Sequence, residues 1–131
     1  MSITKEYAKQ IIATGADLRV PKTWFIHDDI MELTKAAKDA GVRITFNNAE
    51  KMTNEQKVEV LSNGGSISFH HKHYPREKIL EFASIAHKGG GLFIIDGPSK
   101  LNLEMIDAIS AKGKDAVVFD YVYTGSMHGP D

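Results

Sequence analysis

The sequence predicts an α/β protein in which helices alternate with the strands of a parallel sheet and cover one face of it, as in a β/α repeat solenoid. Two observations predict this fold class. The chain matches itself at an offset of 49 residues, and its earlier strand segments alternate apolar with polar residues. A match at fixed spacing indicates a repeat architecture, and an alternating strand has one covered and one solvated face.

The internal match runs without a gap across one predicted helix and the strand that follows it. Residues 29–47 lie over residues 78–96. The pairs are Ile30 with Ile79, Glu32 with Glu81, Ala37 with Ala86, Gly41 with Gly90, Ile44 with Phe93, Phe46 with Ile95 and Asn47 with Asp96. Each period holds two similar helix–strand units, so the module is about half a period long. We therefore expect one domain of about five units over 1–123, followed by a C-terminal tail at 124–131.

Start and stop signals define the elements in order. Asp28 and Asn102 suit helix N-caps, Thr53 with Gln56 forms a capping-box pattern, and Pro75 suits a first helical turn. The glycines that stop the helices are Gly15, Gly41, Gly64, Gly89 and Gly113. The predicted helices are 3–14, 28–40, 54–63, 75–88 and 102–112, and the predicted strands are 17–21, 42–47, 66–70, 91–96 and 116–122.

Two architectures share this element order, and the strand patterns decide between them. The segments 42–47 and 66–70 alternate, which favours the solenoid with its helices on one face. Its inward residues would be Ile44, Phe46, Ile67, Phe69, Phe93 and Ile95. The later segments 92–95 and 116–119 are apolar on both faces, as in a flavodoxin-like doubly wound sheet with helices on both sides, which stays the alternative.

The strand pattern Ile44-Thr-Phe46-Asn-Asn48-Ala49, followed by Met52, resembles that of leucine-rich-repeat and similar short β/α repeat proteins. This resemblance is architectural and covers most of the chain. Such repeats serve mostly as protein-binding scaffolds, so the resemblance implies a protein-binding function.

Composition narrows the classes of partner and location. The chain has 131 residues and a formal net charge of −1, without the basic excess that nucleic-acid binders usually carry. It has no cysteine, and it has no segment with the length and apolarity of a signal peptide or a membrane span. We expect a cytoplasmic, bacterial protein that binds another protein, without a nucleic-acid partner, a membrane or a cofactor.

Polar residues at the predicted strand ends are the first candidate site. They are Asn47, His70, Asp96 and Asp120, which parallel strands bring to one edge of the sheet. His70 to His73 contains three histidines, but neighbouring strand residues point to opposite faces and Lys72 repels a cation, so no metal site is predicted. We expect the four strand-end residues to act together as a recognition surface.

The uncovered sheet face is the second candidate. The polar residues on that face of the earlier strands would be Arg19, Arg43, Thr45 and Ser68. On the later strands, Leu92, Ile94, Ala116 and Val118 would form an apolar patch. The last strand continues into Tyr121 and Tyr123, and aromatic side chains are enriched in interface hot spots. Self-association through this last strand is also possible.

These features predict a non-enzymatic protein-binding module of the adaptor, inhibitor or immunity type, which uses the open sheet face and the strand ends. The alternative is a small enzyme or nucleotide-binding domain with a doubly wound sheet that uses His70, Asp96 and Asp120. Helices on both faces of the sheet would favour that alternative.

Overall fold

A computed structural model describes residues 2–70, 72, 74–98 and 101–122, and it contains one open, fully parallel sheet. The strands lie side by side in the order in which they occur in the chain. They are β1 (Leu18–Pro21), β2 (Ile44–Asn47), β3 (Ser66–His70), β4 (Phe93–Asp96) and β5 (Val117–Asp120). This arrangement is the α/β parallel-sheet class that the sequence predicts.

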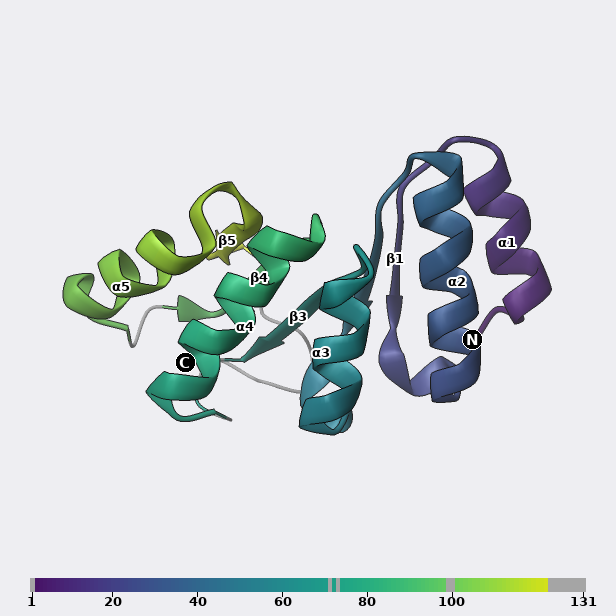
Figure 1. The fold of residues 1–131 in the computed structure, drawn as a ribbon. Coiled ribbons are helices and arrows are strands. Elements are labelled where there is room, and N and C mark those ends of the chain that lie inside the picture. Colours follow the sequence, from purple (N-terminus) through teal and green to yellow (C-terminus); the bar gives the residue numbers. More distant parts are fainter. Residues whose placement is uncertain (1, 71, 73, 99–100, 123–131) are drawn as a thin grey trace.

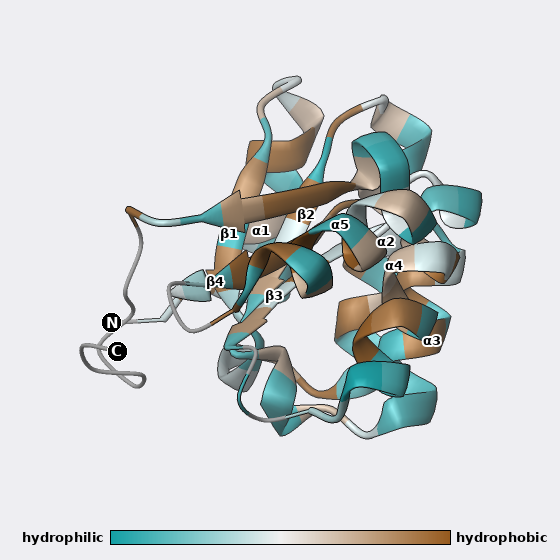
Figure 2. Ribbon diagram, turned by 90° about the vertical axis from the view of Figure 1, so that its left-hand side faces the viewer, coloured by the Kyte–Doolittle hydropathy of each residue, from teal (hydrophilic) through white to brown (hydrophobic). Residues whose placement is uncertain are grey.

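The helices form one layer on one face of this sheet. They are α1 (Lys5–Ala13), α2 (His27–Ala40), α3 (Asn54–Ser62), α4 (Arg76–Gly89) and α5 (Leu103–Gly113). Each helix contacts the next one along the chain, and α3 and α4 lie in front of the strands in Figure 1. The side view of Figure 2 places α2, α3 and α4 to the right of the strands. The sheet is therefore wound on one side, as in a solenoid, and is not doubly wound.

The 49-residue offset in the sequence is also present in the structure. α2 and α4 each have 14 residues, and they begin 49 positions apart at His27 and Arg76. α1 and α3 each have 9 residues and begin 49 positions apart at Lys5 and Asn54. Gly41 and Gly90 end α2 and α4 in the left-handed conformation that glycine adopts readily. Equivalent residues thus take equivalent places in successive 49-residue periods.

Most predicted boundaries hold to within a few residues, with two informative exceptions. Thr53 and Gln56 form the predicted capping box, and Asn102 caps α5. Asp28 does not cap α2, because the helix begins one residue earlier at His27, and its carboxylate instead lies in the first turn, where the helix dipole favours negative charge. The last strand ends at Asp120 rather than at residue 122.

The core between sheet and helices is aromatic at its centre. The Phe69 ring on β3 stacks on Phe93 of β4 with centroids 4.9 Å apart, and Phe93 lies 6.0 Å from Phe82 of α4. Tyr74 packs edge-on against Phe69 at 4.5 Å. Phe69, Phe82 and Phe93 are fully buried. Each such side chain contributes about 1.5–3 kcal/mol to stability by its removal from water.

Close packing of two turns explains part of the glycine run 89–91. A Cβ at Gly89 would lie 1.9 Å from the carbonyl oxygen of Leu61, and a Cβ at Gly91 would lie 2.0 Å from that of Gly65. No side chain fits at these distances. The run therefore lets the turn before β4 pack against the turn before β3, at the edge where the strands begin.

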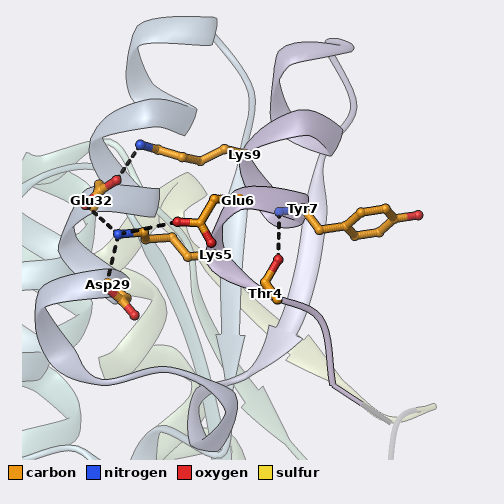
Figure 3. A network of polar contacts seen from close by, with 7 residues as sticks. All are labelled: Thr4, Lys5, Glu6, Tyr7, Lys9, Asp29 and Glu32. Atoms are coloured by element: carbon orange, nitrogen blue, oxygen red, sulfur yellow. Dashed lines mark hydrogen bonds and ion pairs between the residues drawn. The ribbon is translucent and has the colours of Figure 1, made fainter.

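Charged residues fix the first helix to the second (Figure 3). Lys5 Nζ lies 3.2 Å from a carboxylate oxygen of Glu32 and 3.6 Å from one of Asp29, and Lys9 contacts Glu32 as well. The hydrogen bond to Glu32 is the main cause that raises the pKa of Lys5, and the hydrogen bonds from Lys9 and then Lys5 lower the pKa of Glu32. Within the described part of the chain, no helix is long and apolar enough to cross a membrane.

Candidate functional site

The open face of the sheet is defined by strand alternation. Alternate residues of the later strands point toward the helices. Phe93 and Ile95 belong to the helix-covered core, and Val117 and Phe119 pack against it. The residues between them therefore point to the other face. On the open face lie Arg19, Thr45, Asn47, Ser66, Ser68, His70, Ile94, Asp96, Val118 and Asp120. This face is mostly polar, in contrast to the covered one.

The register divides the predicted strand-end residues into two levels. His70, Asp96 and Asp120 are direct neighbours on β3, β4 and β5. Asn47 is not level with them, because β2 pairs Phe46 with Ile67, which places Asn47 beside Ser68. A hydroxyl connects the two levels, since Ser68 Oγ lies 3.1 Å from Asn47 Oδ1 and 3.1 Å from Asp96 Oδ2. The structure thus brings Asn47, His70, Asp96 and Asp120 into one polar cluster through Ser68.

Arg19 crosses the open face from the first strand to the last. Its Nε donates a 2.6 Å hydrogen bond to Asn47 Oδ1, and its guanidinium lies 3.6 Å from Asp96 and 4.0 Å from Asp120. In a flat sheet β1 and β5 would be about 19 Å apart, from a spacing of about 4.8 Å per strand, which is too far for these two side chains to meet. The sheet must therefore twist and coil so that the open face is concave.

Asp96 carries the most perturbed carboxyl of this cluster. Its side chain is 1% exposed, and burial raises its pKa to about 6, although the hydrogen bond from Ser68 and the charge of Arg19 act in the opposite direction. The negative charges of Asp120 and Glu50 raise it further. Asp96 can therefore gain and lose a proton near neutral pH, whereas an exposed aspartate would stay ionised.

A second perturbed group is the buried Lys57, which lies in the first turn of α3. Lys57 Nζ donates 2.9 Å to the carbonyl oxygen of Met52 and sits 4.5 Å from the ring centroid of Tyr74. Burial lowers the Lys57 pKa to about 8 and raises that of Tyr74 well above its usual range. The negative charge of Glu50 adds to the rise of the Tyr74 pKa and opposes the fall of the Lys57 pKa. These contacts hold the turn after β2 against the core.

The remaining predicted residues lie in different places. Arg43 and Leu92 precede β2 and β4, and so lie at the edge where strands begin; Arg43 is exposed and Leu92 is partly buried. Thr45 is 6% exposed and Ile94 is 5% exposed. Tyr121 is exposed just after β5, while Tyr123, His71 and His73 lie outside the described residues. Arg43 and Leu92 are therefore not brought to the polar cluster.

The predicted apolar patch is much smaller than the sequence suggests. Ala116 belongs to a turn before β5 and is buried, and Ile94 is buried because β4 has a neighbouring strand on each side. Val118 on the last strand is the patch member that is clearly exposed. The expectation of an uncovered patch over both later strands is wrong in that respect.

Arg19 and Ser68 are expected on the open face of the sheet, but the predicted site does not include them. Both were identifiable as outward residues of alternating strands, but neither lies at a strand end. Their role depends on the coil of the sheet and on the β2–β3 register, which the alternation does not specify. Lys57 had no visible signal, because a lysine in the first turn of a helix is ordinarily solvated.

Exposed apolar side chains gather at the carboxyl edge, the edge where the strands end. Trp24 and Ile26 follow β1, Leu103 follows β4, and Tyr121 and Val122 follow β5. We call these five residues the carboxyl-edge surface. Among the described residues, the other large exposed apolar side chains are Val118 and Tyr7 on α1. The amino edge of the sheet has none of them.

The fold and this edge define an open, one-sided β/α repeat protein with a polar concave face and an apolar carboxyl edge. Comparisons of the chain with protein-family models, with curated proteins and with solved structures found no match. In the part of the chain that the structure describes, no group of three or more His, Cys, Asp or Glu residues is arranged to hold a metal ion.

Proposed function

We propose that this protein is a binding module that recognises another protein through its carboxyl-edge surface and the adjoining open face. The observation that carries this proposal is the location of the exposed apolar side chains. Tyr121 is 61% exposed, Ile26 66% and Val122 92%, and they follow the first and last strands, whose side chains meet through Arg19 and Asp120. Clusters of exposed apolar residues beside polar ones are typical of protein interfaces.

The proposal also accounts for the asymmetry between the two sheet edges. Loops at the carboxyl edge carry a tryptophan and a tyrosine, two residue types that dominate interface hot spots. At the amino edge, glycines and close backbone contacts fill the turns. An adaptor, an inhibitor or an immunity-type protein would each use such a surface.

The test is a capture experiment from lysate of the source cells, using purified immobilised protein. The test variant carries Tyr121→Ala and Val122→Ser, both at exposed positions. The control is Tyr7→Ala, because Tyr7 is 54% exposed and points away from α2 on the outer flank of α1 (Figure 3). We expect one protein retained by wild type and by the control, and strongly reduced on the test variant.

Hydrogen exchange then locates the contact on the captured complex. Protection should concentrate in residues 22–27 and 118–122. Equal capture by all three proteins, or protection confined to the helices, would contradict the proposed interface.

A catalytic role is the second candidate, and Asp96 favours it. Burial raises the pKa of its carboxyl to about 6, and the group lies beside Arg19 and the Ser68 hydroxyl, an environment suited to a general acid or base. A thermal-shift screen of small metabolites tests this role, with Asp96→Asn as the comparison. A compound that stabilises wild type but not this variant would support the catalytic role. If no compound does so, the binding module remains the proposed function.

A further inference from the structure

The charged end of Lys57 lies in the core, among oxygen atoms and ring faces. The residue is 2% exposed. Its Nζ lies 2.9 Å from the carbonyl oxygen of Met52 and 3.3 Å from Asn54 Oδ1. It also faces the rings of Tyr74 and Phe82, whose centroids are 4.5 and 5.6 Å away. In the described part of the chain, no carboxylate forms an ion pair with this ammonium.

A lysine in these surroundings is harder to charge than a lysine in water. Two oxygen acceptors and two ring faces replace part of the lost hydration shell, but a buried charge without a carboxylate partner stays costly. Burial accordingly lowers the Lys57 pKa to about 8, from the ordinary 10.5. The proton therefore favours any state of the protein in which Lys57 reaches water.

The neighbouring elements place one charge and one phenol near this amine. Glu50, in the turn after β2, is the charged side chain that acts on it, and its negative charge opposes the fall of the Lys57 pKa only in part. Tyr74, in the connection after β3, keeps its phenol protonated because burial raises its pKa. α4 contributes the ring of Phe82 and α3 the amide of Asn54, and neither group titrates. The charge that changes near pH 8 in this cluster is therefore that of Lys57.

Lys57 bonds to a short turn at the carboxyl edge. The turn is η2 (Ala49–Lys51), which lies just after β2 and has Met52 as its C-cap. Ala49 and Met52 are both buried. Besides the bond from Lys57 to Met52, the turn receives a long hydrogen bond of 3.4 Å from the Tyr74 hydroxyl to the carbonyl oxygen of Ala49. Lys57 thus supplies the shorter of these two side-chain bonds.

Both ends of this turn are suited to movement of the residues between them. Asn48 has a left-handed conformation (φ 61°), which asparagine adopts more readily than most residues. Thr53 begins the capping box of α3, so the helix keeps its own start when the turn moves. The turn also contacts η1 (Lys22–Trp24), which carries Trp24 of the carboxyl-edge surface. A displacement of residues 49–52 therefore changes the support of Trp24.

We propose that residues 49–52 form a latch controlled by one proton: they open away from the core more often when Lys57 is charged than when it is neutral, and the turn that carries Trp24 opens with them. A neutral amine still donates a hydrogen bond to the carbonyl oxygen of Met52, but it no longer costs the hydration of an ammonium. A rise in pH therefore closes the latch, and a fall in pH opens it. This device goes beyond the proposed binding function, and its test needs no partner.

Amide hydrogen exchange, followed by NMR and corrected for the intrinsic effect of pH, measures the opening. The Lys51 and Met52 N–H groups donate hydrogen bonds within the latch, and the Phe25 N–H donates one within η1. Lys57 has a pKa of about 8 in the closed state and regains the ordinary 10.5 in the open one. We therefore expect the opening equilibrium constant at all three amides to fall roughly tenfold from pH 7 to pH 9.

Lys57→Met removes the charge and keeps a side chain of similar length. Its latch should open equally at pH 7 and pH 9. Lys51→Met is the matched control, because it removes a lysine charge from the turn itself at an exposed position, and it should keep the tenfold fall. Glu50→Gln provides a second test that leaves Lys57 in place. Loss of the Glu50 charge lowers the Lys57 pKa further, so the fall between pH 7 and pH 9 should become steeper. Circular dichroism confirms that each variant is folded.

The proposal is overturned by a wild-type opening constant that does not change between pH 7 and pH 9, or by an equal fall in Lys57→Met. If Lys57→Met does not fold, an unaltered pH dependence in Glu50→Gln overturns it. A Phe25 amide that ignores pH while Met52 follows it would remove Trp24 from the device. All these measurements use the free protein, so their failure is distinct from that of the capture experiment, which tests the binding function alone.

Discussion

The two faces of the sheet stabilise this protein in different ways. On the helix-covered face, Phe69 and Phe93 stack within an apolar layer in which shape and dispersion dominate. On the open face, Ser68 and Asp96 are also almost fully buried, but they are polar and bond to each other. Side chains of this fold can therefore be buried on the face that no helix covers. The buried groups of that open face depend on hydrogen bonds to one another.

This difference has an energetic consequence. An apolar side chain on the covered face contributes through the area it removes from water, which is the larger contribution to stability. A buried polar group gains little net free energy from its hydrogen bond, but leaving it unpaired is costly. We therefore expect substitutions on the covered face to lower the free energy of unfolding. Substitutions on the open face should mainly change proton binding and the recognition of a partner.

Phe93→Ala should give the largest loss of stability, about 3–5 kcal/mol, because it removes a fully buried ring and leaves a cavity. Val118→Ala, on the open face of the neighbouring strand, should cost less than about 1 kcal/mol, since Val118 is exposed. Chemical denaturation of both variants measures the difference. Equal losses would mean that the open face is as tightly packed as the covered one.

Asp96→Asn should change the pH dependence of stability. The folded-state pKa of Asp96, about 6, lies above the ordinary aspartate pKa of 3.8, so the folded protein binds more protons than the unfolded one between these values. The contribution of Asp96 to stability is thus present below about pH 4 and is lost as the pH rises through 6. At about 1.4 kcal/mol per pKa unit, the variant should gain about 2–3 kcal/mol relative to wild type between pH 4 and pH 7.

Urea unfolding of wild type and Asp96→Asn at a series of pH values measures this gain. A stability difference that stays constant from pH 4 to pH 7 would show that Asp96 ionises at its ordinary pKa in the folded protein.

Much of the covered face could be predicted from sequence, for a physical reason. The 49-residue offset relates α2 and β2 to α4 and β4, and helix periodicity with strand alternation identifies Ile44, Phe46, Ile67, Phe93 and Ile95 as core residues. These signals are local, because a side chain that points inward does so through its own strand or helix.

The open face could be predicted only in part. Its strand-end residues were identifiable, but whether Asn47 lies level with His70 depends on how β2 and β3 pair, and the register puts it beside Ser68 instead. The reach of Arg19 to Asp120 depends on the accumulated twist of the sheet, which arises from the packing of the whole domain. Neither property is encoded in a short stretch of chain.

Ser68→Ala should have an intermediate effect on stability, about 1–2 kcal/mol. The hydroxyl is buried and lies 3.1 Å from both Asn47 Oδ1 and Asp96 Oδ2, so its loss leaves buried acceptors with one fewer donor. The Asp96 pKa should also rise, because the Ser68 hydrogen bond lowers it. Denaturant unfolding and NMR titration of the Asp96 carboxyl measure both effects. Ser62→Ala, at an exposed position, is the control and should change neither.

Arg19→Met should have the smallest effect on stability. It therefore tests whether the charges of the open face contribute to folding at all. The Arg19 side chain is 36% exposed and its ion pairs to Asp96 and Asp120 are long, so its loss should cost less than about 1 kcal/mol. The Asp96 pKa should nevertheless rise, because the charge of Arg19 lowers it. A large destabilisation with an unchanged Asp96 pKa would mean that Arg19 holds the coil of the sheet together. The open face would then be a structural clamp, rather than a surface whose charges are available to a partner.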